Sequence, residues 1–215
     1  MEVSPPIDMV FIHGRPGSGK GTQVDELKIR HPELTVIYPG KILRGSQDPE
    51  DDLYTRFNSF VQPHVETMAN GGLIPPDDFF KIITPLIEET IQAEGSQLLF
   101  DGFPRGVEYL RKFDQMIQSL REKGNDVRML HVYLAASEMK AGSRIGIRKE
   151  GYDQRIDDKS EAVKRRMEVF KSETFPMLRE LNNRGELVII RGDRNVTEVQ
   201  QELEQRVSQF LKPRV

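Results

Sequence analysis

The sequence contains no cysteine, which excludes disulfide bonds and metal sites built from thiolates. It also has no apolar run near the roughly 20 residues that a membrane-spanning helix needs. The run Leu-Val-Ile-Ile at 187–190, for example, is short and flanked by charged residues. Residues 1–8 show no basic region followed by an apolar core, so no secretory signal is expected. Together these absences favour a cytoplasmic protein that does not bind membranes.

An excess of positive charge is absent as well. The 31 lysine and arginine residues face 34 aspartate and glutamate residues, a net charge of −3, which argues against a general nucleic-acid-binding protein. Hydrophobic residues make up 37% and charged residues 30% of the 215 residues, a composition adequate for a folded core. This length permits one α/β domain with small inserts.

Short apolar runs alternate with helical patterns along most of the chain. The alternation predicts a parallel sheet of five strands with helices on both faces, an α/β fold. Two regions, about 38–73 and 142–158, fit the alternation badly and are candidate inserts. We expect the strands near 8–12, 36–38, 98–100, 128–134 and 187–190, with helices between them and one that begins at residue 160.

The segment HGRPGSGKGTQ, which begins at residue 13, lies between the first expected strand and helix. Gly14, Gly19 and Lys20 match the phosphate-loop pattern, whereas Gly21 takes the usual hydroxyl position and Thr22 follows it. Glycines let backbone N–H groups approach phosphate oxygens, and Lys20 can reach the outer phosphates. A glycine-rich turn without a ligand is the alternative, but a lysine between strand and helix argues against it. The predicted ATP-binding residues here are Gly17, Ser18, Gly19, Lys20, Gly21 and Thr22.

A carboxylate ends the third expected strand. Asp101 follows Leu-Leu-Phe and would border the ligand crevice of a parallel sheet. There it can hold a hydrated Mg²⁺ that bridges phosphate oxygens, although a lone aspartate after a strand is more often a helix cap. The next residues, Gly-Phe-Pro-Arg, favour the first interpretation, because Gly102 and the proline fix the backbone and Arg105 supplies a planar fork suited to phosphate.

The two motifs GRPGSGKGTQ and DGFPR, in this order, closely resemble the adenylate kinase family of nucleoside monophosphate kinases. The resemblance runs from about residue 8 to residue 211. It implies a P-loop NTPase-type sheet of five parallel strands flanked by helices, with Mg²⁺ as cofactor and ATP and a nucleoside monophosphate (NMP) as partners. The implied reaction is transfer of the γ-phosphoryl group of Mg·ATP to the NMP, most often AMP in this family. We expect a monomer.

The resemblance also divides the single domain into parts. It implies a core of about 8–37, 74–143 and 159–211, a helical NMP-binding insert at about 38–73 and a short lid at about 144–158. In the insert, Gly40 and Arg44 match the family pattern, whereas Pro39 and Lys41 depart from it. The residues implied for NMP binding are Gly40, Arg44, Ile74, Gly102, Arg105, Tyr109, Arg155 and Arg166.

Tyr109 is the largest departure from the family. Adenylate kinases have Gln at this position, and the pyrimidine-directed relatives have Asn. A tyrosine can stack on a base or offer one hydroxyl, but it cannot supply both hydrogen bonds of an amide. Two interpretations stay open: Tyr109 contacts the acceptor base, or it is a core residue of its helix. Acceptor identity is open as well, with CMP or UMP as the alternative to AMP.

Several arginines follow the pattern of the family's lid. Arg144 and Arg148 are four residues apart and share a face if helical. Arg155 precedes an Asp-Asp pair, and Arg166 lies on the next helix. Each alone is more typical of a surface salt bridge. For the residues taken together, the resemblance implies two roles. The residues implied for catalysis are Lys20, Arg105, Arg144, Arg155 and Arg166. The arginines implied to contact ATP are Arg144, Arg148 and Arg194.

Two other functions compete with a kinase. Pro39, Lys41 and Tyr109 motivate a nucleotide-binding regulatory protein with a decayed acceptor site, whereas Arg44 and Arg105 speak against it. A GTPase-type switch lacks support, because the sequence has no NKxD-type motif that reads guanine. The kinase is therefore the preferred interpretation.

Overall fold

The structure, a computed structural model, describes residues 6–94, 97–149 and 160–212. Within these residues, five strands form one sheet in the order β2–β3–β1–β4–β5. Every neighbouring pair is parallel, so the predicted parallel sheet of five strands is confirmed. The strands are β1 (Ile7–His13), β2 (Thr35–Ile37), β3 (Gln97–Asp101), β4 (Val127–Ala135) and β5 (Leu187–Arg191).

Helices connect the strands, as the alternation predicts. The helix expected from residue 160 does begin there, and it continues through a π-helical turn, η2 (Phe170–Thr174), into α9 (Phe175–Asn183). A short 3₁₀ turn, η1 (Gln62–His64), separates two helices of the region 38–73. The other helices are α1 (Lys20–Arg30), α2 (Pro39–Gly45), α3 (Asp52–Val61), α4 (Val65–Ala69), α5 (Pro76–Glu94), α6 (Val107–Glu122), α7 (Glu138–Lys149), α8 (Ser160–Val169) and α10 (Val196–Leu211).

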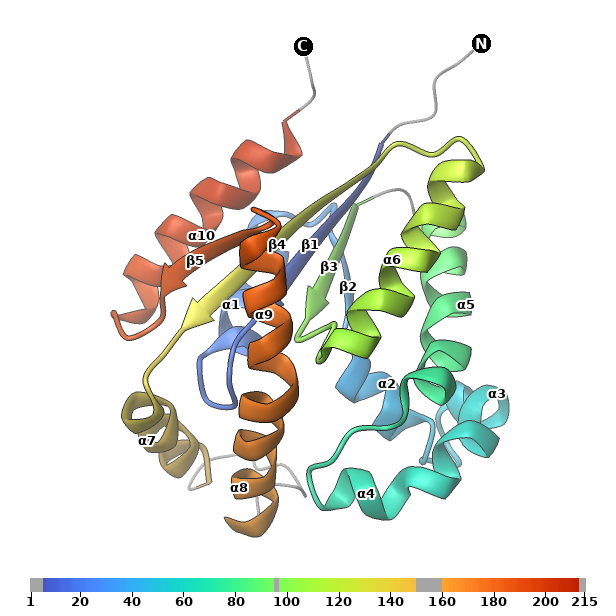
Figure 1. The fold of residues 1–215 in the computed structure, drawn as a ribbon, viewed down its shortest axis with the longest axis horizontal. Coiled ribbons are helices and arrows are strands. Elements are labelled where there is room, and N and C mark those ends of the chain that lie inside the picture. Colours follow the sequence, from blue (N-terminus) through green and yellow to red (C-terminus); the bar gives the residue numbers. More distant parts are fainter. Residues whose placement is uncertain (1–5, 95–96, 150–159, 213–215) are drawn as a thin grey trace.

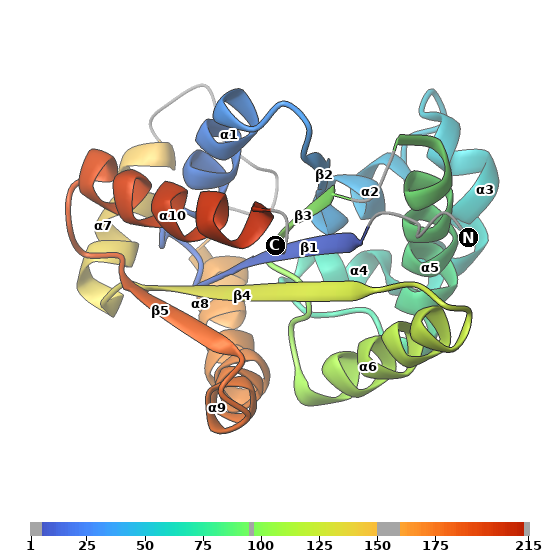
Figure 2. The same ribbon diagram turned by 90° about the horizontal axis from the view of Figure 1, so that it is seen from above.

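Both faces of the sheet are covered, as Figure 2 shows from above. Helices α1 and α10 pack on one face, where Val10 and Ile12 of β1 meet apolar side chains such as Leu203. On the other face, Met9 and Phe11 pack with side chains of α5 and α6. Successive strand residues point to opposite faces, which explains why every residue of the central strand β1 is buried.

The strand ends define where a ligand can bind. In Figure 1 the strand arrows point toward the end of the molecule where α7 and α8 stand on one side and α2–α4 on the other. Phe57 and Val61 of α3 form a small apolar cluster with Ile82 of α5, which attaches this helix to the core. Ligands of parallel α/β sheets bind at the carboxyl ends of the strands. The loop between β1 and α1 opens at this end.

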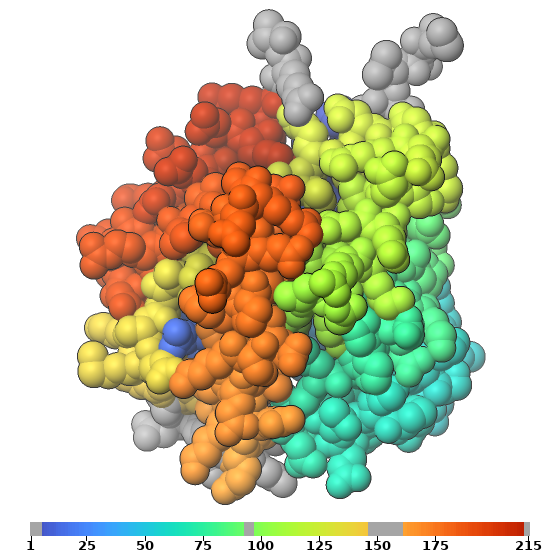
Figure 3. Space-filling model, viewed as in Figure 1, coloured from blue at the N-terminus to red at the C-terminus, as the bar shows by residue number. Residues whose placement is uncertain are grey.

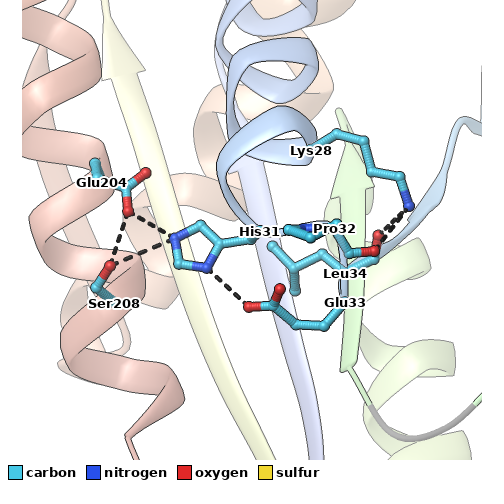
Figure 4. Close-up of polar contacts among 7 residues, drawn as sticks. All are labelled: Lys28, His31, Pro32, Glu33, Leu34, Glu204 and Ser208. Carbon is cyan, nitrogen blue, oxygen red and sulfur yellow. Dashed lines mark hydrogen bonds and ion pairs between the residues drawn. The ribbon is translucent and has the colours of Figure 1, made fainter.

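At its other end, α1 is tied to α10 by a polar cluster around His31 (Figure 4). His31 Nε2 lies 2.7 Å from Glu204 Oε1, and its Nδ1 lies 2.9 Å from Glu33 Oε1. Ser208 donates a hydrogen bond of 2.9 Å to Glu204. Burial lowers the pKa of His31, but the hydrogen bonds with Glu33 and Glu204 outweigh it and raise this pKa above 6.5. The phosphate-loop helix is thus held against α10 by the hydrogen bond between His31 and Glu204, which becomes an ion pair when His31 is protonated.

Among the residues that the structure describes, no helix combines the length and the apolar character that crossing a bilayer requires.

Candidate active site

The phosphate loop is pressed against α7. Gly17 and Gly19 have φ angles of 77° and 93°, a left-handed conformation that favours glycine. A Cβ atom on Gly17 would also overlap the carbonyl oxygen of Ala141 in α7. Gly19 is the residue that caps the N-terminus of α1. The positive end of this helix therefore faces the loop, as an anion site needs.

Lys20 bends back over this loop. Its Nζ donates hydrogen bonds to the carbonyl oxygens of Gly14, at 2.7 Å, and Arg15, at 3.1 Å. The ammonium group is therefore held within the loop, where the sequence predicts contact with phosphates. Of its neighbours, Ser18 is buried and Thr22 is exposed on the first turn of α1, whereas a Cβ atom on Gly21 would have open space.

Gly102 lies between the cations of two separate segments. Its N–H donates to the carbonyl oxygen of Ile12, at 2.9 Å, so it extends from β3 alongside β1. A Cβ atom on Gly102 would lie 3.4 Å from Cε of Lys20 and 3.7 Å from Nη2 of Arg105. Arg105 is exposed, and its Nε donates to the carbonyl oxygen of Gly102 at 3.1 Å. Gly102 itself is buried, and the side chains of Lys20 and Arg105 both come close to it.

Asp101 directly precedes Gly102 and ends β3, where it pairs with Ile12 of β1. Its Oδ1 is buried and has no hydrogen-bond partner among the described residues. The described residues contain no group of three acidic or histidine side chains able to enclose a metal. Mg²⁺, however, is bound by one or two carboxylates together with waters and substrate phosphates. The orphaned oxygen of Asp101 fits that kind of site.

Asp101 also affects its neighbour at the end of β2. The pKa of Tyr38 is raised, mainly by burial. The hydrogen bond with Asp25 and the charges of Asp25 and Asp101 raise it further. Tyr38 donates to Asp25 of α1 at 2.8 Å. The ammonium group of Lys41 lies 4.0 Å from the centre of the Tyr38 ring, so a cation–π contact accounts for the position of this unusual lysine.

Arg144 joins α7 to two loops. Its Nη1 donates to the carbonyl oxygen of Ser18, at 3.2 Å, and its Nη2 to that of Arg194, at 3.3 Å. The side chain of Arg194 itself bonds to Glu202 of α10 and to the carbonyl oxygen of Arg191. The backbone of the turn after β5 therefore faces Arg144, while the guanidinium of Arg194 faces α10.

The predicted acceptor residues lie on both sides of the strand ends. In α2, a Cβ atom on Gly40 would be 3.4 Å from Nη1 of Arg44, so the arginine folds over this glycine. On α8, Cγ of Arg166 lies 3.0 Å from the position of a Cβ atom on Gly71. Helix α8 thus contacts the turn that ends α4. This contact brings Arg166 toward the region predicted to hold the acceptor.

Tyr109 is part of the core. The residue is 7% exposed, and its hydroxyl donates to the carbonyl oxygen of Ile74. Its ring meets that of Phe79 edge-on, with 5.4 Å between the ring centres. Burial raises the pKa of Tyr109, which keeps the hydroxyl protonated. These contacts agree with the interpretation of Tyr109 as a core residue, and they occupy the carbonyl group of Ile74.

The side chains of two predicted arginines, Arg148 and Arg155, lie outside the described part of the structure. Arg148 lies in α7 one turn after Arg144, and its side chain is outside the described part of the structure. Arg155 and the Asp-Asp pair that follows it lie outside the described residues altogether. Their roles stay predictions.

A buried histidine pair next to the phosphate loop was not anticipated. His13 Nε2 lies 3.0 Å from His131 Nδ1 of β4. Burial, His131 and Lys20 hold the pKa of His13 well below 6.5, and burial with Arg184 lowers the pKa of His131 to about 3. Both rings are therefore neutral near pH 7. The pairing depends on the register of β1 and β4, which no local sequence signal indicates.

Comparison with known proteins agrees with this geometry. The family model for adenylate kinase matches residues 12–186. The chain belongs to the adenylate kinase family. It is 30% identical over 197 residues to adenylate kinase 1 of Nostoc sp., with 91% of this chain and 95% of the relative covered.

Other members of the family differ in their named acceptors. An adenylate kinase of Parabacteroides distasonis is 30% identical over 190 residues, with 88% of this chain and 92% of the relative covered. UMP-CMP kinase 1 of Oryza sativa subsp. japonica is 28% identical over 193 residues, with 90% of this chain and 71% of the relative covered. The chain is thus similar to adenylate kinases and also to a pyrimidine-directed member.

Proposed function

We propose that this protein is a nucleoside monophosphate kinase that transfers the γ-phosphoryl group of Mg·ATP to AMP, giving two ADP. One observation carries the proposal. Lys20 of the phosphate loop and Arg105 both approach Gly102, with Cε of Lys20 3.4 Å and Nη2 of Arg105 3.7 Å from the position of a Cβ atom on this glycine. A phosphate chain that passes over Gly102 would meet a cation from the donor side and one from the acceptor side.

This arrangement suits direct phosphoryl transfer. Such a reaction depends on positioning and charge stabilisation, and no protein nucleophile is needed. On the donor side, the loop N–H groups, Lys20 and Arg144 would bind the phosphates of ATP. Asp101 would hold Mg²⁺ through water, and the bound ion would neutralise part of the charge on the transferring group.

On the acceptor side, Arg105 and Arg44 would grip the phosphate of AMP. We propose that the insert at 38–73 and the lid at 144–158 enclose the two nucleotides, with Arg155 and Arg166 completing the cationic ring. Enclosure would exclude water and so suppress hydrolysis of ATP. We also propose that the enzyme acts as a monomer in the cytoplasm.

A second acceptor class is supported by the similarity to a UMP-CMP kinase, and Tyr109 does not argue against it. Its hydroxyl bonds to Ile74 and its ring is buried, so it offers no amide pair to an adenine. Discrimination between bases is weak when an edge contact is missing. CMP and UMP are therefore the alternative acceptors.

The test is a panel of acceptors. Purified protein is given Mg·ATP with AMP, CMP, UMP, GMP or their deoxy forms, and ADP formation is measured. The proposal expects the highest kcat/KM with AMP, whereas a higher value with CMP or UMP would support the alternative. If no acceptor supports ADP formation, the kinase proposal is overturned and a regulatory nucleotide-binding protein is favoured.

A further inference from the structure

Arg15 lies inside the phosphate loop and holds it together through its backbone. The carbonyl oxygen of Arg15 accepts the N–H of Ser18, at 3.1 Å, and the Nζ of Lys20, also at 3.1 Å. Two residues predicted to bind ATP therefore depend on where this one peptide group lies. A shift of Arg15 would move both of them.

The side chain of Arg15 contacts residues of two helical segments. It is 16% exposed, its Cζ lies 5.3 Å from the ring centre of Phe170, and its Nη1 lies 3.6 Å from Oε1 of Glu138. Glu138 begins α7, and Phe170 begins the π-helical turn η2. In Figure 3 a small blue area of the N-terminal part of the chain is visible between yellow α7 and orange α8. The guanidinium is thus packed between helices.

The turn under Arg15 also contacts the second cationic segment. Phe170 and Thr174, at the two ends of η2, are both buried. The hydroxyl of Thr174 donates to the carbonyl oxygen of Arg105 at 2.7 Å. A π-helical turn adds a residue within a helix and often occurs at functional sites. Here it supports the phosphate loop at one end and the backbone of Arg105 at the other.

We propose that Arg15 is a positioning residue that fixes the phosphate loop in its ATP-binding shape, with the ring of Phe170 as its support. The proposal rests on the binding of ATP by this loop. Arg15 acts through the loop backbone, since its guanidinium is directed at Phe170 and Glu138. A loop that is ordered before ATP arrives loses less conformational freedom on binding. A cation packed over an aromatic ring supplies that order.

The experiment replaces Arg15 by methionine, which keeps the length and apolar packing but removes the charge. The Kd for ATP, measured by calorimetry without acceptor, is expected to rise about threefold to tenfold. The KM for AMP is expected to stay unchanged. Arg15→Lys keeps a cation over Phe170 and is expected to retain most of the affinity. Arg56→Met is the matched control and is expected to leave Kd unchanged, because it removes an arginine of α3 that lies over the ring of Phe57 and pairs with Glu89.

A double-mutant cycle tests the role of Phe170. Phe170→Leu alone is expected to raise the Kd for ATP. In the double variant with Arg15→Met it is expected to raise the Kd little further, because each change removes the same contact between Arg15 and Phe170. Glu138→Gln is expected to have a smaller effect, since this carboxylate is 54% exposed and 3.6 Å away.

Several results would overturn the proposal. They are an unchanged Kd in Arg15→Met, equal weakening of ATP and AMP together with a lower Tm, or additive effects of the two changes. If Arg15→Met does not fold, Phe170→Leu carries the test, and wild-type affinity for ATP in this variant would refute the inference. ATP binding is measured without acceptor, so failure of the kinase proposal in the acceptor panel is a separate outcome.

Discussion

The guanidinium of Arg144 donates a hydrogen bond of 3.2 Å to the carbonyl oxygen of Ser18, which lies 126 positions earlier in the chain. A second hydrogen bond of 3.3 Å reaches the carbonyl oxygen of Arg194. Helix α7 therefore places one cation at the junction of the phosphate loop and the turn after β5. This position is suited to contact with the phosphates of ATP.

Substitution of Arg144 by glutamine tests this role. Glutamine can still donate to one carbonyl group but carries no charge, so the KM for ATP is expected to rise about tenfold, equivalent to roughly 1.4 kcal/mol. The KM for AMP is expected to change by less than about twofold. Steady-state kinetics with each nucleotide varied in turn measure both values. Equal increases in the two KM values would contradict a donor-side role.

Lys20→Ala is expected to lower kcat by about a hundredfold or more, roughly 3 kcal/mol of transition-state stabilisation, because the charge on the outer phosphates loses its partner. Lys28 provides the matched control, since its Nζ also donates to two backbone carbonyl groups, those of Pro32 and Leu34. Lys28→Ala is expected to keep kcat. Near-normal turnover in Lys20→Ala would contradict a role of this lysine in stabilising the transition state.

Arg105→Ala is expected to cause a loss of similar size, about a hundredfold in kcat, through the acceptor phosphate. Arg105→Lys is expected to restore little of it, because an ammonium group cannot reproduce the planar fork of a guanidinium. The control is Arg111→Ala in the following helix α6, where the arginine pairs with Glu108 on the surface. Full recovery in Arg105→Lys would mean that only charge is required at this position.

Tyr109→Phe separates a core role from a base-reading role. The change leaves the carbonyl group of Ile74 without its donor, so the free energy of unfolding is expected to fall by about 1–3 kcal/mol. Chemical denaturation measures that loss, and Tyr38→Phe, whose hydroxyl bonds to Asp25 nearer the surface, is expected to lose less. The order of acceptors in the nucleotide panel is expected to stay the same. A changed order would show that the hydroxyl contacts the base.

The His31 cluster predicts how stability depends on pH. The pKa of His31 is raised above 6.5 in the folded protein, so its contribution is fully present below pH 6.5 and is lost as pH rises through the folded-state pKa. Tm is therefore expected to fall more steeply above pH 6.5 in the wild type than in His31→Gln. Glu204→Gln is expected to reduce the same slope. Identical Tm profiles for wild type and His31→Gln would exclude this contribution.

Local signals in the sequence predicted much of the fold. The apolar run before Gly14 and the helix from Lys20 indicated a strand, loop and helix, because each depends on neighbouring residues alone. The same holds for the strand that ends at Asp101. Parallel alternation then placed these strand ends at one edge of the sheet, where Lys20 and Arg105 both lie near Gly102. The roles of these two residues stay predictions.

Contacts between distant segments were not predictable in this way. The burial of Tyr109 depends on where Ile74 crosses α6, and the pairing of His13 with His131 depends on strand register. The side chain of Arg194 turns toward Glu202 because α10 brings that carboxylate alongside. The π-helical turn η2 likewise has no sequence pattern of its own. Tertiary packing decides each of these features.

The central claim is that two nucleotides meet end to end over Gly102. The most direct test is a crystal structure with a bisubstrate ligand in which two adenosines are joined by a chain of five phosphates. We expect the phosphate chain to cross Gly102, with Lys20 and Arg144 on the donor half and Arg44 and Arg105 on the acceptor half. A ligand bound elsewhere, with Lys20 and Arg105 directed into solvent, would contradict the account.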